Sequence, residues 1–132
     1  MSKQYHIFIS HAWKYDDDYN KIVEWLDDSD LDWKNYSVPE HDPIDADNKE
    51  KLKEALTNQI KPSSVVIIIA AMYANYSEWI DYEIDEAVRM GKSIIGVKPW
   101  GQERVPKKIQ DNADKLVGWN SISVINAVKE LG

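Results

Sequence analysis

One carboxylate in this chain has neighbours that suit bond-breaking chemistry. Glu83 follows Trp79 by four residues, so on a helix the two side chains lie on one face, one turn apart. A glutamate beside an aromatic ring is partly shielded from water, and such a carboxylate stabilises a developing oxocarbenium ion. That positive charge develops when an N- or O-glycosidic bond breaks. The same spacing also occurs on ordinary solvated helix faces, so these residues alone leave both interpretations open.

Polar and aromatic side chains gather in three segments, at 10–15, 36–44 and 72–79. They are Ser10, His11, Trp13, Tyr36, Ser37, His41, Tyr73, Asn75, Tyr76 and Trp79. The chain has six Trp and seven Tyr against one Phe, and these rings combine a flat apolar face with a polar group. Part of the set can therefore line a cleft that accepts a ring, with Trp13 and Tyr76 as candidate stacking residues. Packing in a small core is an equal alternative for both.

The elements that must position these residues alternate between strand-like and helix-like stretches. Strand-like runs lie at 5–10, within 31–37, at 64–71, at 93–97 and at 116–119. Helical stripes lie at 16–28, from Asp47 to Pro62, from Ser77 to Gly91, at 106–115, and from a cap at Ser121 or Ser123 onward. Five such alternations predict one α/β domain over residues 1–132, a parallel sheet with helices on both faces. Ligands of such sheets bind beyond the carboxyl ends of the strands, which is where the three segments fall.

The helix after the third strand carries the candidate carboxylate. Ser77 is expected to cap its start, and Gly91 is expected to end it in a left-handed conformation. Its core face is predicted from the spacing of Ile80, Ile84, Ala87 and Val88. Glu83 adjoins this face without belonging to it, and its neighbours Asp81, Asp85 and Glu86 are expected on the solvated side.

Several familiar chemistries are excluded by the residues at the strand ends. The segment at 10–15 reads SHAWKY and lacks the glycines of a dinucleotide-binding turn or a phosphate-binding loop. A phospho-receiver domain needs an aspartate where Ala70, Ala71 and Met72 stand. The three histidines show no metal-ligand spacing, and His6, which alternates within the first strand, is expected to be structural. We therefore expect neither a bound metal nor a resident cofactor.

Composition narrows the class of partner and the compartment. The formal net charge of −7 argues against nucleic acid. The longest strongly apolar run, at 65–72, is too short to span a membrane. The chain contains no cysteine and does not open with a signal-peptide pattern, so a cytoplasmic location is expected.

Three stretches together resemble the TIR (Toll/interleukin-1 receptor) domain superfamily. YHIFISHAW resembles the first strand and loop of these domains, and YSEWIDYEIDEA resembles the helix motif after their third strand. Ser77, Trp79, Glu83 and Ile84 fall on the positions of that motif, although Ile80 replaces a frequent cysteine. NYSVPEHDP takes the place of the loop after the second strand. The region from Ile94 to Asn120 is similar to a short bacterial TIR-like branch of the Thoeris anti-phage signalling type.

The resemblance implies a flavodoxin-like three-layer sandwich with a five-stranded parallel sheet of order 2-1-3-4-5. It also implies an enzyme that cleaves NAD, as a substrate, at the nicotinamide N-glycosidic bond, with Glu83 as the catalytic residue. Ser10, His11, Tyr36 and Ser37 would then contact the nucleotide, and Trp79 would shape the ribose pocket. The product would be a linear, cyclic or otherwise modified ADP-ribose, which the sequence does not specify.

Partners and alternative functions follow from the same resemblance. A cyclic or modified ADP-ribose would signal to a separate effector in anti-phage defence, and the chain would self-associate or assemble with other TIR domains. Some TIR-like domains are non-catalytic interaction modules, which is the main alternative. A nucleoside-processing transferase, which has a related fold and a glutamate at a glycosidic bond, is a further one.

Overall fold

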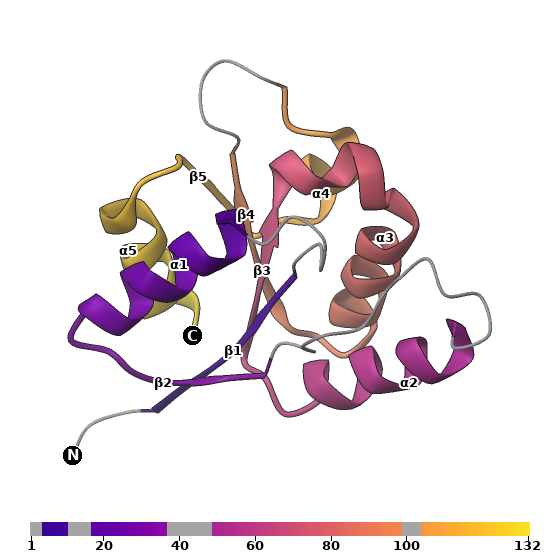
Figure 1. Cartoon of the computed structure of the whole chain (residues 1–132), viewed down its shortest axis with the longest axis horizontal. Helices are drawn as coiled ribbons and strands as arrows, with labels where there is room; N and C mark the ends of the chain where they lie inside the picture. Colours follow the sequence, from indigo (N-terminus) through magenta and orange to yellow (C-terminus); the bar gives the residue numbers. More distant parts are fainter. Residues whose placement is uncertain (1–3, 11–16, 37–48, 99–103) are drawn as a thin grey trace.

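The computed structural model describes residues 4–10, 17–36, 49–98 and 104–132, apart from the side chains of residues 49, 52, 72 and 74–77. These residues form a five-stranded parallel sheet of order β2-β1-β3-β4-β5 (Figure 1). The strands are β1 (Gln4–Ile9), β2 (Asp32–Asn35), β3 (Val65–Ile69), β4 (Ser93–Val97) and β5 (Lys115–Val117). The predicted α/β class, flavodoxin-like architecture and strand order are confirmed.

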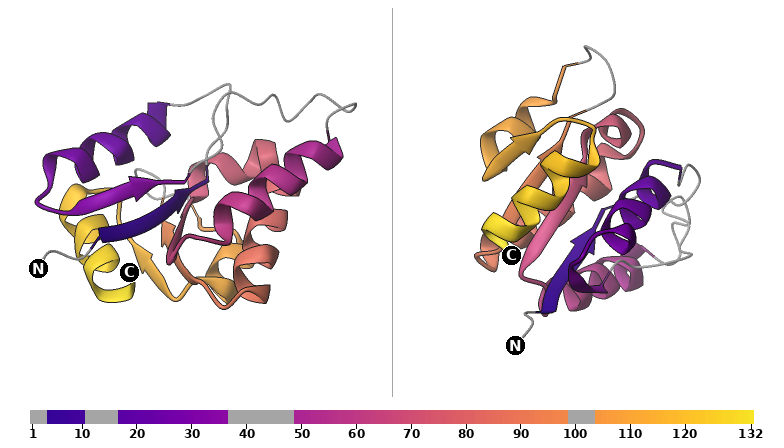
Figure 2. Two further views of the ribbon diagram at one scale, coloured as in Figure 1. Left: turned by 90° about the horizontal axis from the view of Figure 1, so that it is seen from below. Right: turned by 90° about the vertical axis from the view of Figure 1, so that its left-hand side faces the viewer.

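Helices cover both faces of the sheet and make three layers (Figures 1 and 2). One face carries α1 (Asp17–Asp28) and α5 (Ser121–Leu131), and the other carries α2 (Lys49–Ile60), α3 (Tyr73–Arg89) and α4 (Lys107–Asn112). The longest of them, α3, has 17 residues. Within the part of the chain that the structure describes, no helix has the length and apolarity needed to cross a membrane.

The central strand explains why the sheet is covered on both sides. All five residues of β3 are buried, because Val and Ile stand at every position and both faces of the strand must therefore be shielded from water. β3 pairs with β1 on one side, Ile7 opposite Val65, and with β4 on the other, Val65 opposite Ser93. Chain order reverses between β1 and β3, so the switch point of the sheet lies between these two strands.

The start of α3 differs from the prediction. Ser77 was expected at the N-cap, but the helix begins at Tyr73, after a 3₁₀ turn over Ala70–Met72. No glycine or proline separates the strand from the helix, so the backbone turns from β3 into α3 directly. Ser77 therefore lies inside the helix, and Trp79 and Glu83 lie further from its first turn than expected.

The buried face of α3 also differs from the prediction. Ile80, Ile84 and Ala87 are buried as expected, but the side chain of Val88 is 52% exposed. Glu83 is instead part of the buried face, with 3% of its surface exposed. At 100° per residue, Glu83 lies within the arc of the buried residues, whereas Val88 lies beyond its edge. The helix thus directs a carboxyl group into the interior and leaves an aliphatic side chain in water.

Two helix ends show how local sequence sets element boundaries. Gly91, after the end of α3, has a φ of 70°, which confirms the predicted left-handed residue. At the start of α5 the predicted serine caps are wrong: Asn120 is the N-cap, and its side chain accepts a hydrogen bond from the Ser123 backbone N–H at 2.8 Å. Asparagine is as good a cap as serine, and its position one residue earlier lets it reach the free N–H groups of the first turn.

Candidate active site

The candidate site centres on the carboxyl group of Glu83 in α3. The side chains of Trp79 and Glu83, one turn apart, are both buried. The predicted pairing of an aromatic ring with a carboxyl group on one helical face is therefore present, and Glu83 is more deeply buried than the sequence indicated. Burial matters because an ionised carboxylate loses its hydration there.

Ser10 supplies the partner of this carboxyl group. It follows the last residue of β1, and its backbone N–H donates to the Ile67 carbonyl of β3 at 2.9 Å. Its hydroxyl donates to Glu83 Oε1 at 2.8 Å, across 73 residues of sequence. Both side chains are almost fully buried. The contact joins the carboxyl end of β1 to the helix that follows β3, at the switch point of the sheet.

Burial changes the acidity of Glu83. Desolvation raises the pKa of Glu83 to about 8, and the Ser10 hydrogen bond, which favours the ionised form, opposes that rise. No basic side chain among the described residues bonds to this carboxyl group or offsets its burial. Without a ligand the group therefore holds its proton near neutral pH. A positive charge placed beside it would favour ionisation.

Tyr36 lies at the neighbouring strand end, but its hydroxyl turns away from Glu83. Its backbone N–H donates to the Ile7 carbonyl at 2.8 Å, which fixes it beside β1. Its hydroxyl shares a hydrogen bond of 2.8 Å with His6 Nδ1, and the Lys34 ammonium lies 5.2 Å from its ring centroid. His6 precedes Ser10 by four residues, about 13 Å along a strand. The structure thus gives His6, which was expected to be structural, a specific partner.

The remaining predicted site residues are not all described. His11, Trp13 and Ser37 lie outside the described residues, as does the side chain of Tyr76. Of the eight predicted site residues, the structure brings Ser10 and Glu83 into contact and places Trp79 one turn from Glu83. It directs the hydroxyl of Tyr36 elsewhere. Among the described residues, no cluster of acidic or histidine side chains suits a metal ion.

An acidic residue near Glu83 makes hydrogen bonds that the sequence did not predict. Glu86 was expected on the solvated side of α3, yet it accepts hydrogen bonds from Thr57 Oγ1 at 2.7 Å and Arg89 Nε at 2.6 Å. The Arg89 hydrogen bond is the main reason that the pKa of Glu86 is lowered to about 2. Tyr82 hydroxyl lies 2.6 Å from Thr57 Oγ1 and completes a network between α2 and α3. The i, i+4 spacing of Tyr82 and Glu86 could have predicted the contact between these two residues of α3, but not their contacts with Thr57 of α2.

Two further acidic residues of α3 also have partners. Asp81 accepts a hydrogen bond from the Tyr73 hydroxyl at 2.6 Å, and this bond is the main reason that the pKa of Tyr73 is raised to about 12. Asp85 pairs with Lys108 of α4 at 2.7 Å. Among these acidic residues of α3, Glu83 is the buried one, and its partner Ser10 lies at the end of β1.

A five-stranded parallel sheet of order 2-1-3-4-5, covered by helices on both faces, defines a flavodoxin-like α/β protein. The family model described as "Thoeris protein ThsB, TIR-like domain" matches residues 8–104, and the chain belongs to this family. No curated protein sequence matches the chain significantly.

Two solved structures share the fold. The CMP N-glycosidase BcmB of Clostridium botulinum superposes with a TM-score of 0.60 at 12% identity, over 95% of this chain and 98% of that one. A 3-dehydroquinate dehydratase-like protein from Bifidobacterium longum gives a TM-score of 0.52 at 11% identity, over 99% of this chain and 95% of that one. At these identities the similarity concerns the fold.

Proposed function

We propose that this protein cleaves NAD at the nicotinamide N-glycosidic bond, with Glu83 as the catalytic residue. The observation that carries the proposal is the buried Glu83 carboxyl group, bonded to Ser10 at the switch point of the sheet. Membership of the Thoeris TIR-like family supports a nucleotide-derived signal as the purpose of the reaction. The N-glycosidase that shares the fold supports glycosidic-bond cleavage as the class of chemistry.

The proposed step moves one electron pair. The bond between ribose C1′ and the pyridinium nitrogen breaks, and its electrons stay on that nitrogen, so nicotinamide leaves as a neutral molecule. The positive charge passes to the ribose ring, where the Glu83 carboxylate stabilises it. Only Oε1 of Glu83 is bonded to a described residue, which leaves Oε2 for the ribose hydroxyls. Capture of C1′ by water gives ADP-ribose with loss of a proton, and capture by an adenine nitrogen gives a cyclic isomer.

Substrate charge fits the acidity of this carboxyl group. With a pKa of about 8, Glu83 is mainly protonated at neutral pH before a ligand binds. A pyridinium ring held beside it supplies the positive charge that the described residues do not, and so favours the carboxylate. Binding of the cationic substrate therefore prepares the group that stabilises the transition state.

The output would be a diffusible signal. We propose that a cyclic or modified ADP-ribose made here activates a separate effector in anti-phage defence. We also propose that the chain self-associates or assembles with another TIR domain. Family membership supports these roles, and the small molecules that the protein makes test the signalling role.

The test is nicotinamide release by purified protein, measured by mass spectrometry with and without lysate from phage-infected cells. Glu83→Gln is expected to keep the fold and lose release, because the amide retains the shape without the charge. Glu54→Gln, at an exposed position of α2, is the matched control and is expected to retain full release. Full release by Glu83→Gln would eliminate this mechanism and favour a non-catalytic interaction module.

A nucleotide substrate other than NAD is the second candidate, because the CMP N-glycosidase shares the fold over almost the whole chain. The same assay run with CMP and with free nucleosides separates the two. Free base released from these compounds, together with intact NAD, would identify the chain as a nucleoside- or nucleotide-processing enzyme.

A further inference from the structure

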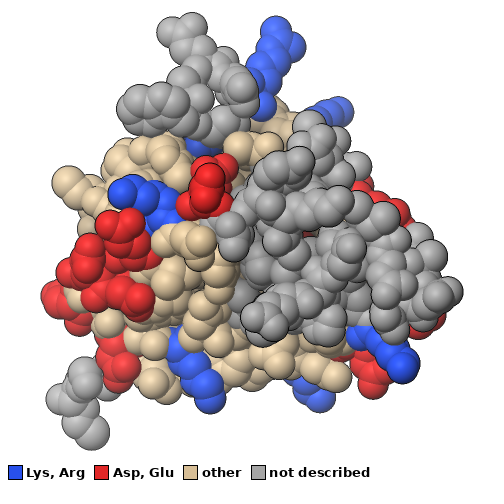
Figure 3. All heavy atoms as spheres, in the orientation of Figure 1, with Lys and Arg blue, Asp and Glu red and all other residues tan. Residues whose placement is uncertain are grey.

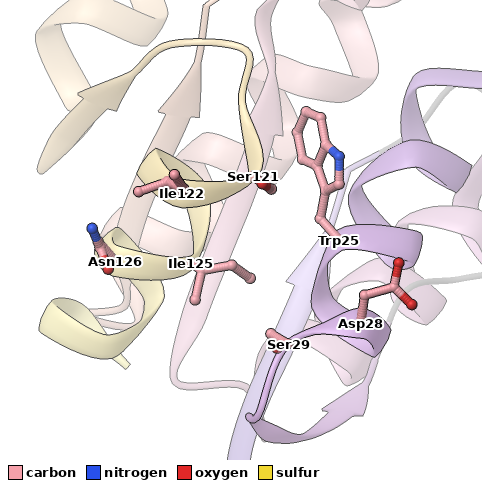
Figure 4. Close-up of a pocket in the computed structure, with 7 residues that line it drawn as sticks. All are labelled: Trp25, Asp28, Ser29, Ser121, Ile122, Ile125 and Asn126. Atoms are coloured by element: carbon pink, nitrogen blue, oxygen red, sulfur yellow. The ribbon is translucent and has the colours of Figure 1, made fainter.

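A groove lies between α1 and α5 (Figure 4), and α3 covers the opposite face of the sheet (Figures 1 and 2). Its volume is about 300 Å³, and its lining comes from both helices: Trp25, Asp28, Ser29, Ser121, Ile122, Ile125 and Asn126. Trp25 stands on the α1 side and Ile125 on the α5 side, with Ser29 below them (Figure 4). The proposed reaction makes no use of this groove.

Apolar side chains form much of the lining of this groove. Ile122 is 72% exposed, the most exposed large aliphatic residue that the structure describes. Trp25 is half-buried, and its ring packs against Trp119 at 5.0 Å between centroids, which holds it in place as a wall. An exposed isoleucine, a fixed indole and a second half-buried isoleucine thus place apolar surface side by side in this groove.

The α1 rim of this groove is acidic. This helix carries five acidic residues and one lysine, and its last turn holds Asp27 and Asp28 with no basic residue. Carboxylates at a helix C-terminus oppose the helix dipole. Asp28 lies at the groove and pairs with no described side chain, while Asp27 accepts a hydrogen bond from Trp33 Nε1 at 3.0 Å. Figure 3 shows acidic side chains gathered at the left of the molecule, where α1 lies.

We propose that the α1–α5 groove binds a basic amphipathic helix of a partner protein. An aliphatic or aromatic side chain of that helix would pack between Trp25, Ile122 and Ile125, and its lysines or arginines would lie over the carboxylates of α1. The charge excludes a second copy as the preferred occupant, because a symmetric pairing would bring two acidic helices together. The site lies across the sheet from Glu83, so the partner would bind without covering the candidate active site.

The first test uses two synthetic 18-residue peptides with the same leucine stripe at i, i+3, i+4 and i+7. One has lysine at its other positions and the second has glutamate. Binding to the full chain is measured by calorimetry, and its place is mapped by amide NMR shifts. The lysine peptide is expected to bind and to shift the amide NMR signals of α1 and α5. Its affinity is expected to fall as the salt concentration rises.

Single substitutions test whether the lysine peptide binds in the α1–α5 groove. Ile122→Ser is expected to lower the affinity for the lysine peptide at least tenfold, and Asp28→Asn severalfold. Neither substitution should change thermal unfolding, because both side chains are exposed. Val88→Ser removes the other large exposed aliphatic side chain of the described residues and is expected to change nothing. The proposal is overturned if the lysine peptide does not bind, if the glutamate peptide binds equally, or if Ile122→Ser has no effect. It is also overturned if the chain alone is a dimer that Ile122→Ser dissociates.

Discussion

At the scale of single residues, Glu83 combines two properties that stability alone would not select. It is almost fully buried, and its described partner is a neutral hydroxyl rather than a cation. A glutamine at this position would keep the hydrogen bond without the desolvation of a charge. Keeping an acid here therefore fits a need for negative charge during catalysis.

The first prediction concerns pH. If the carboxylate of Glu83 is the active form, kcat/KM for NAD should rise with pH, about tenfold per unit, and level off above a pKa of about 8. Carbon NMR of the Glu83 carboxyl group measures the same ionisation without turnover. A rate that is flat from pH 6 to 9 while the carboxyl group titrates in that range would contradict this assignment.

The second prediction concerns stability. The native pKa of Glu83 is about 8 and its ordinary value is 4.5, so between these pH values the unfolded chain releases a proton that the native state keeps. Wild-type stability therefore falls as pH rises through this window. Glu83→Gln should remove that loss, with a gain on the order of a few kcal/mol at pH 8.5 and little gain at pH 4.5. Urea unfolding at both pH values measures it, and an equal gain at both would refute the burial of the charge.

At the scale of elements, α3 is held in place on two sides. Its buried face contacts the sheet through Ile80, Ile84 and Ala87, and its flank is tied to α2 through Thr57, Tyr82 and Glu86. A helix with two such attachments has little freedom to rotate. The position of Glu83 relative to Ser10 follows from this fixation.

The third prediction tests that attachment. Thr57→Val keeps the shape of the side chain and removes hydrogen bonds to Tyr82 and Glu86, so unfolding should be easier by about 1–3 kcal/mol. Ser64→Ala, which removes an exposed 3.2 Å hydrogen bond to the His6 carbonyl, is the control and should change stability by less than about 0.5 kcal/mol. Thermal and urea unfolding provide the measurement. Equal effects of the two substitutions would show that the network does not stabilise the α2–α3 contact.

At the scale of the whole molecule, the sheet separates two surfaces. Glu83 and Ser10 meet on the side covered by α2, α3 and α4, and the α1–α5 groove lies on the other side (Figures 1 and 2). The parallel sheet between them is completely buried at its central strand. A partner on one side and a substrate on the other therefore need not compete.

The fourth prediction follows from this separation. Ile122→Ser should leave nicotinamide release unchanged within about twofold, because the side chain is exposed and lies across the sheet from Glu83. Steady-state rates of the wild type and the variant are compared under identical conditions, with Glu83→Gln as the inactive reference. A large loss of activity in Ile122→Ser would mean that the two faces are coupled.

The amino-acid sequence by itself determined the alternation of strands and helices, the burial of β3 and the left-handed residue at Gly91. These features depend on local periodicity and on the backbone freedom of single residues, so they can be predicted from short stretches of sequence. The spacing of Trp79 and Glu83 could be recognised for the same reason. The helix starts could not be read in this way. α3 begins before Ser77 because no glycine or proline separates it from β3, and Asn120 caps α5 because asparagine and serine are caps of similar strength.

Only the tertiary structure decided what these residues contact. Ser10 meets Glu83 across 73 residues because β1 and β3 are neighbours and α3 packs over their ends. The orientation of α3 then buried Glu83 and exposed Val88, and the pairing of β1 with β2 let the Tyr36 hydroxyl reach His6. Such contacts depend on strand register and helix rotation, which the whole core sets at once and no short stretch of residues encodes.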